Sequence, residues 1–141
     1  MFNFKGRMII GLLFIMLSTN ATASDGLFDI TVTALKGSIG SEWNSIKNTS
    51  RYTIYYKVTV SNNSKVPLTP GKENQLCFYL DDDNGHTLLA HSVQVDFLKP
   101  YQPGESRDGM IYFASINHKL LILPFVKLAI GKQCSMLLKQ K

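Results

Sequence analysis

The chain has 141 residues, of which 45% are hydrophobic and 18% charged, and its formal net charge is +5 at pH 7. This length suits one domain with a single core, and the high apolar content favours a packed fold over disorder. The basic residues are scattered, whereas nucleic-acid-binding modules concentrate them on one face, so we expect no nucleic-acid partner.

The N-terminal 23 residues have the pattern of a secretory signal peptide. The basic start "MFNFKGR" precedes the apolar run "MIIGLLFIML", and the segment ends in Ala21-Thr22-Ala23, an A-x-A cleavage signal. A membrane anchor is the alternative, but it needs about 20 consecutive apolar residues, and polar residues follow this run directly. We therefore expect cleavage before Ser24, no stable membrane anchor afterwards, and a bacterial protein that is periplasmic or secreted.

The expected organisation is a signal peptide at residues 1–23 and one domain at residues 24–141. Removal of Lys5 and Arg7 with the signal leaves 13 basic against 10 acidic residues, so the net charge falls to +3. About 118 residues remain, which is enough for a single hydrophobic core.

The two cysteines, Cys77 and Cys134, both lie in apolar segments. In an oxidising compartment, an isolated pair indicates one disulfide. The alternative is a reactive thiol or a metal ligand, which needs a base or a positive neighbourhood that the spacing does not supply. We expect the disulfide.

A period of two in hydrophobicity dominates the rest of the chain and predicts half-buried strands. In "LFDITVTAL" and "YTIYYKVTV" the inward sets are Phe28, Ile30, Val32 and Ala34, then Ile54, Tyr56, Val58 and Val60. Further strands are expected in "QLCFYL", "HTLLAHSVQVDFL", "GMIYFA", "FVKLAIG" and "QCSMLL", with turns in segments such as "GSIGSEWNSIKNTS" and a short helical turn in "SINHKLLILP". This pattern predicts an all-β fold: a single-domain antiparallel immunoglobulin-like β-sandwich of about seven strands.

Three segments resemble a known group of proteins. The order "YYKVTVSNNSKVPLTP", "LKPYQPGESRDGMIYFA" and "FVKLAIGKQC" is similar to small exported immunoglobulin-like (telokin-like) bacterial domains of unknown function. The resemblance implies the sandwich fold and export, and it carries over no catalytic residue.

The stretch "FYLDDDNGHTLLAH" is the part of the sequence that most resembles a metal or acid-base site, because it joins three aspartates, Asn84-Gly85 and two histidines. No register places oxygen ligands where a helix-loop-helix calcium loop needs them. A β-hairpin fits, with Asn84-Gly85 as its two-residue turn. Asp81, Asp82 and Asp83 then lie at an exposed strand end, where a weak cation site is the alternative.

Other metal and enzyme patterns are not found in the sequence. On an extended strand, His86 and His91 would lie on opposite faces about 16 Å apart, and Cys134 and Met136 have no histidine beside them to complete a copper site. The sequence has none of the usual hydrolase or phosphate-binding motifs, so we expect no cofactor, no resident metal and no catalysis.

Two classes of function remain open. The first is a non-enzymatic protein-binding or structural accessory domain of the bacterial envelope, with an unidentified envelope or secreted partner contacted through Trp43, Tyr52, Tyr55 and Tyr101; an inhibitor or immunity-like protein is a narrower form of it. The second is a periplasmic ligand or metal-ion carrier that uses the acidic hairpin. These four aromatic rings could equally cover the ends of the core.

Overall fold

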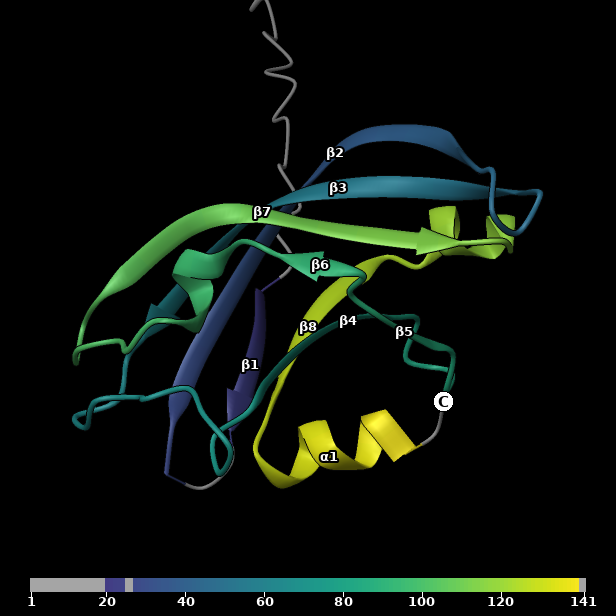
Figure 1. Ribbon diagram of the computed structural model, residues 1–141. Coiled ribbons are helices and arrows are strands. Elements are labelled where there is room, and N and C mark those ends of the chain that lie inside the picture. Colours follow the sequence, from purple (N-terminus) through teal and green to yellow (C-terminus); the bar gives the residue numbers. More distant parts are fainter. Residues whose placement is uncertain (1–19, 25–26, 140–141) are drawn as a thin grey trace, which may run out of the picture.

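The computed structural model describes residues 20–24 and 27–139, and its two antiparallel sheets form a sandwich (Figure 1). One sheet has the strand order β1-β2-β3-β7-β6 and the other β5-β4-β8. The elements, in chain order, are β1 (Asn20–Ser24), β2 (Asp29–Asn44), β3 (Thr49–Asn62), β4 (Leu76–Asp81), β5 (Thr87–Leu89), β6 (Ser92–Val93), η1 (Val95–Leu98), β7 (Ser106–Ser115), η2 (His118–Ile122), β8 (Phe125–Ile130) and α1 (Lys132–Lys139).

The predicted β-sandwich of about seven strands is confirmed, since residues 27–139 form the seven strands β2 to β8. The predicted inward faces of β2 and β3 are confirmed as well. Val32 lies opposite Val60 and Ala34 opposite Val58 in the register, and these strands share one core with Phe78 and Leu80 of the second sheet. The alternation in sequence reports this packing, because successive residues of a strand point to opposite faces.

The segment "GSIGSEWNSIKNTS", expected to be a connecting loop, is instead the end of one long hairpin. β2 runs on to Asn44, and only residues 45–48 form the turn before β3. A bulge between Lys36 and Ile39 shifts the register by one residue. Gly37 is required there, because a Cβ atom at this position would lie 2.9 Å from the carbonyl oxygen of Tyr55.

The segment "HTLLAHSVQVDFL", predicted as one strand, is divided into β5, β6 and η1. The chain changes sheets at this point. The N–H of Ala90 donates to Phe78 of one sheet at 2.8 Å, and the N–H of His91 donates to Tyr112 of the other at 2.8 Å. The chain pairs with a different sheet on each side of this point, so the prediction of one continuous strand was wrong, and His91 is exposed.

The segment "QCSMLL", also predicted as a strand, lies in helix α1. Gly131, at a φ of 58°, ends β8 and turns the chain into the helix. The N–H of Ser135 then donates to the carbonyl of Gly131 at 3.0 Å. The apolar residues Cys134, Leu137 and Leu138 have the i, i+3, i+4 spacing of a helix face. The prediction of a strand here was therefore wrong. The short helical turn expected near His118 is present as η2.

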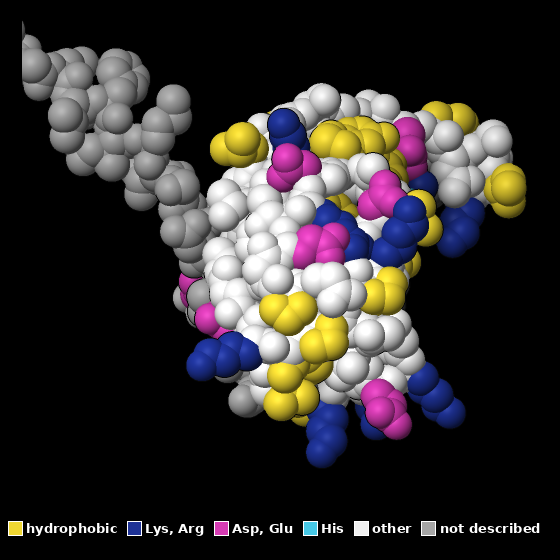
Figure 2. All heavy atoms as spheres, turned by 90° about the vertical axis from the view of Figure 1, so that its left-hand side faces the viewer, with side chains coloured by type: hydrophobic (Ala, Val, Ile, Leu, Met, Phe, Trp, Pro, Cys, Tyr) yellow, Lys and Arg dark blue, Asp and Glu magenta, His cyan; other side chains and the backbone are white. Residues whose placement is uncertain are grey.

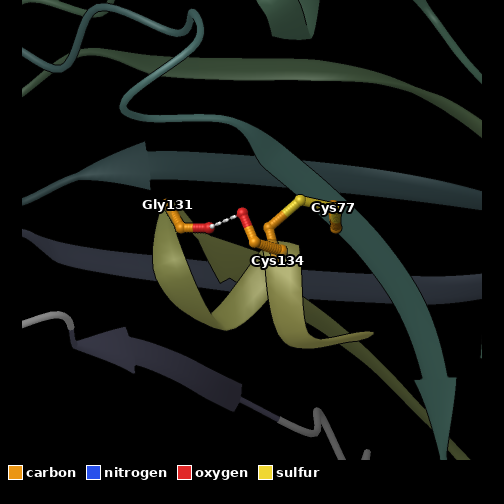
Figure 3. Close-up of a disulfide and its surroundings, with 4 residues drawn as sticks. Cys77, Gly131 and Cys134 are labelled. Atoms are coloured by element: carbon orange, nitrogen blue, oxygen red, sulfur yellow. Dashed lines mark hydrogen bonds between the residues drawn. A yellow bond between two sulfur atoms is a disulfide. The ribbon is translucent and has the colours of Figure 1, made fainter. Parts of the chain in front are cut away.

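The predicted disulfide between Cys77 and Cys134 is present (Figure 3). It joins β4 to the buried side of α1, with a Cα–Cα separation of 5.3 Å. Cys77, Cys134 and Ala129 form a small cluster apart from the main core. The disulfide therefore holds the C-terminal helix against the second sheet.

We predict that replacing both Cys77 and Cys134 by serine lowers the free energy of unfolding by about 4 kcal/mol. The bond closes a loop with a sequence separation of 57 residues, and its loss returns that entropy to the unfolded chain. Guanidinium unfolding measures the difference. Met136→Ser, an exposed change on the same helix, is the control and shifts stability by at most about 0.5 kcal/mol; equal stability of the double variant and the native protein would contradict the prediction.

Candidate protein-interaction surface

The hairpin of β2 and β3 extends past the end of the second sheet (Figure 1). The register places Ile39 opposite Ile54, Ser41 opposite Tyr52 and Trp43 opposite Ser50. Directly opposed residues share a face, and Ile54 points into the core with no exposed surface. Ile39, Trp43 and Tyr52 therefore continue the inner face of the sheet beyond the core, and we call these three residues the overhang face.

The overhang face is apolar and accessible. Ile39 is 53% exposed, Trp43 63% and Tyr52 39%. The second sheet does not cover this part of the hairpin, and η2 covers it only in part, with the His118 ring edge-on to Tyr52. Of the four aromatic residues expected to bind a partner, the structure brings only Trp43 and Tyr52 together on this face.

Tyr55 lies on the opposite, outer face of the same sheet. Its ring packs on that of Tyr112 with centroids 4.7 Å apart, and Leu35 and Met110 are exposed on the outer face as well. Tyr55 and Trp43 therefore cannot contact one flat partner surface together. The sequence could not separate them, because the bulge that sets the face of Trp43 is invisible in the hydrophobic pattern.

Tyr101, also expected on a binding surface, is fully buried. Its backbone pairs with Leu68 through hydrogen bonds of 2.8 and 2.9 Å, and the Arg107 guanidinium lies 4.2 Å from its ring centre. Burial raises the pKa of Tyr101 to about 12. This residue anchors the loop after η1 in the core, as the alternative interpretation of the aromatic residues anticipated.

Glu42 joins the hairpin to β7 on the outer face. Glu42 falls in the segment expected to be a turn, but it lies in β2, where it accepts a hydrogen bond of 2.6 Å from the Tyr112 hydroxyl and forms an ion pair with Arg51. The Tyr112 hydrogen bond and Arg51 hold the pKa of Glu42 below its usual value. Desolvation, followed by this bond to Glu42, raises the pKa of Tyr112 to about 12.

We predict that Tyr112→Phe raises the pKa of Glu42 toward its ordinary value, since the largest cause of its depression is removed. A depressed carboxyl pKa stabilises the fold above the unfolded pKa, and this contribution is lost as pH falls through the folded pKa. The variant should therefore lose less stability on acidification. Carboxyl NMR titration measures the pKa, with Tyr55→Phe as the control that keeps the bond to Glu42; an unchanged Glu42 pKa in Tyr112→Phe would refute the assignment.

The acidic stretch does form a hairpin between β4 and β5, but its turn differs from the expected one. The positive φ angles belong to Asp83 (59°) and Gly85 (88°), so the prediction of a two-residue turn at Asn84-Gly85 was wrong. The Asp82 carboxylate explains the difference. It accepts the N–H groups of Asn84 and His86 at 2.8 and 3.1 Å, which fixes a longer loop of the Asx type.

The ammonium group of Lys127 forms ion pairs with two of the three carboxylates that were considered above as a weak cation site. Its ammonium group lies 2.7 Å from Asp81 Oδ2 and also pairs with Asp83. Desolvation lowers the pKa of Lys127, but the hydrogen bonds that its ammonium group donates to the two aspartates outweigh this effect, and the net shift of the pKa is upward. Asp82 instead pairs with His86 Nδ1 at 2.7 Å. Within residues 20–24 and 27–139, no group of three His, Cys, Asp or Glu side chains is placed to hold a metal.

We predict that millimolar calcium leaves the melting temperature of the native protein unchanged, because Lys127 neutralises Asp81 and Asp83. Lys127→Gln frees both carboxylates and is the variant in which calcium should stabilise the fold. Differential scanning fluorimetry with and without calcium compares the two proteins. A calcium-dependent rise in the melting temperature of the native protein would contradict this prediction and support a cation site at these carboxylates.

A pocket of about 580 Å³ opens beside the overhang face. The acidic hairpin lines one side with Asp82, His86 and Leu88, and the opposite side includes Ser115, Lys119 and Ile122. Ser115 pairs with Tyr52 in the register, and the Tyr52 ring meets the His118 ring edge-on at 6.3 Å. The pocket and the overhang face are therefore adjacent.

The charges at the far end of the sandwich, near η1 and the start of β7, are mixed. Figure 2 shows Lys and Arg side chains beside Asp and Glu, with hydrophobic groups between them. In this region Arg107 forms an ion pair with Glu105, and Lys99 forms one with Asp96.

In the described part of the chain, no helix is long and apolar enough to cross a membrane.

Comparison with known proteins identifies the fold alone. No protein-family model matches the sequence, and no curated protein matches it significantly. Among solved structures, the fold is similar to that of an ApaG protein from Pseudomonas aeruginosa PAO1, with a TM-score of 0.61 and 24% sequence identity. The match covers 70% of this chain and 92% of that one. The expected immunoglobulin-like architecture is thus confirmed as an ApaG-like sandwich.

Proposed function

We propose that this chain is an exported, non-enzymatic protein-binding domain of a bacterial envelope, belonging with the small exported immunoglobulin-like domains that its sequence resembles. The observation that carries this proposal is the overhang face. An aromatic ring as large as Trp43 is rarely left 63% exposed beside exposed Ile39 and Tyr52 unless a partner covers it.

The scaffold supports this role. The overhang face lies on a paired hairpin, so its side chains are held in place before a partner arrives, which lowers the entropic cost of binding. Ile46, at the turn of the same hairpin, is 94% exposed and extends the apolar surface. The predicted signal peptide and the disulfide both agree with an oxidising compartment.

We predict that Trp43→Ala weakens binding of the partner by about 2 kcal/mol or more, which is roughly thirtyfold in Kd. The disulfide-bonded protein is immobilised and exposed to native envelope and secreted fractions, and retained proteins are identified by mass spectrometry. Tyr52→Ala should weaken the same interaction. Because both side chains are partly exposed, neither change should unfold the domain.

Tyr55→Ala is the matched control, since Tyr55 is similarly exposed but lies on the outer face. A partner lost on Trp43→Ala and kept on Tyr55→Ala supports the proposal. A partner retained by both overhang variants, or lost only with Tyr55→Ala, would contradict it.

A ligand carrier is the second candidate, and the pocket favours it. Its volume of about 580 Å³ is in the range of small-molecule sites, and Lys119 and His86 could pair with an anionic group. Native mass spectrometry of the purified protein tests this function. A bound small molecule that is lost in Lys119→Ala would favour the carrier over the protein-binding domain, and an inhibitor or immunity-like role would appear as stoichiometric capture of a hydrolase or toxin.

A further inference from the structure

The predicted cleavage site lies within a strand of the sandwich. β1 (Asn20–Ser24) is the edge strand of the first sheet and pairs antiparallel with Asp29–Thr33 of β2 (Figure 1). The signal Ala21-Thr22-Ala23 forms the middle of this strand. A cut between Ala23 and Ser24 would therefore remove four of its five residues.

Removal of β1 opens a slot between two sheet edges. β8 is the last strand of the second sheet, and β1 lies against β8 as well as pairing with β2. Asp29 bonds toward the β3 side, where its carbonyl accepts the N–H of Asn63 at 2.8 Å. In the antiparallel alternation, the groups that face β1 are therefore those of Ile30 and Val32. Without β1, the backbone N–H and C=O groups of these two residues lose their β1 partners. Unpaired edge groups are the template to which an extended segment adds as a further strand.

We propose that processing by signal peptidase turns the N-terminal half of β2 into a docking site for one extended segment of a partner protein. This inference rests on the proposed export. The occupant is a single free strand because the structure shows one seated there, in a slot that has β2 on one side and β8 on the other. The edge of a second folded copy carries its own sheet behind it and does not fit such a slot.

The register also defines the chemistry of the occupant. Ala21 and Ala23 of β1 lie opposite Val32 and Ile30, which are buried in the core. The incoming strand therefore needs small, uncharged residues at two alternate positions. The remainder of the β2 edge leads from this slot through the bulge to Trp43, so a partner bound here can also reach the overhang face.

The first part of the test follows the chain through export. The full-length chain is produced with its own leader in a bacterial host, and the intact mass of the periplasmic protein is measured. A mass that begins at Ser24 is expected. An exported protein that retains residues 20–23 would overturn the inference while leaving the proposed function intact, whereas failure to export would contradict both.

The second part measures the open edge directly by amide hydrogen exchange of the periplasmic protein. The probe is the peptide STNATAS, which carries the sequence of β1. At ten times its dissociation constant it should slow exchange at the β2 edge amides by about tenfold. An N-methylated peptide, which cannot pair as a strand, and STNKTKS, with lysine at both alternate positions, should have no effect.

Three results would overturn the inference. The first is edge amides that are already protected in the processed protein, and the second is equal protection by STNATAS and its N-methylated form. The third is a processed protein that fails to fold or that dimerises through β2, because the slot would then be either essential to the fold or filled by a second copy. The first two results leave binding through Trp43 untouched, whereas a processed protein that fails to fold would also remove the overhang face and so contradict the proposed function.

Discussion

The pairing of β2 with β3 is the interaction on which the rest of the structure depends. Thirteen register positions join these strands, and their inner residues supply much of the core. The same ladder continues past the core to the turn at residues 45–48, and it is this continuation that holds Ile39 and Trp43 in the open. A single element thus provides both stability and the candidate interaction surface.

Much of this fold is readable from the sequence where strands are half-buried. The alternation in residues 28–34 and 54–60 gave the correct faces, because one side of each strand packs on the core. The pairing of Cys77 with Cys134 followed from there being only two cysteines, together with the oxidising compartment expected from the N-terminal segment. The resemblance to small immunoglobulin-like domains agreed with the ApaG-like sandwich.

The errors arose where tertiary contacts decide between local alternatives. The change of sheets between Ala90 and His91 depends on partners far along the chain. Helix α1 follows the turn at Gly131 and is tied to β4 by the disulfide. Tyr101 looked like a loop aromatic, yet its pairing with Leu68 draws it into the core. Trp43 and Tyr52 were named as candidates from the sequence, but the face that they share, the bulge that sets it and the pocket beside it were not.

The N-terminal edge and two of the three overhang residues, Ile39 and Trp43, belong to the same strand, so the two proposed binding regions are continuous along β2. One end of β2 pairs with the segment that carries the predicted cleavage signal, and the other end carries Trp43. A partner that adds a strand to the first end would extend along the exposed edge toward the second. The disulfide lies away from this edge, between β4 and α1, and is free to stabilise the domain without contacting a partner.

Site-specific photo-crosslinking in living cells is the most direct test of whether a partner protein binds the overhang face. A photoreactive phenylalanine replaces Trp43 in the exported chain, and a second protein carries it at Tyr55 on the outer face. A discrete crosslinked adduct is expected from position 43, and no adduct of the same mass is expected from position 55. No adduct at position 43, or the same adduct from both positions, would contradict an interaction through the overhang face.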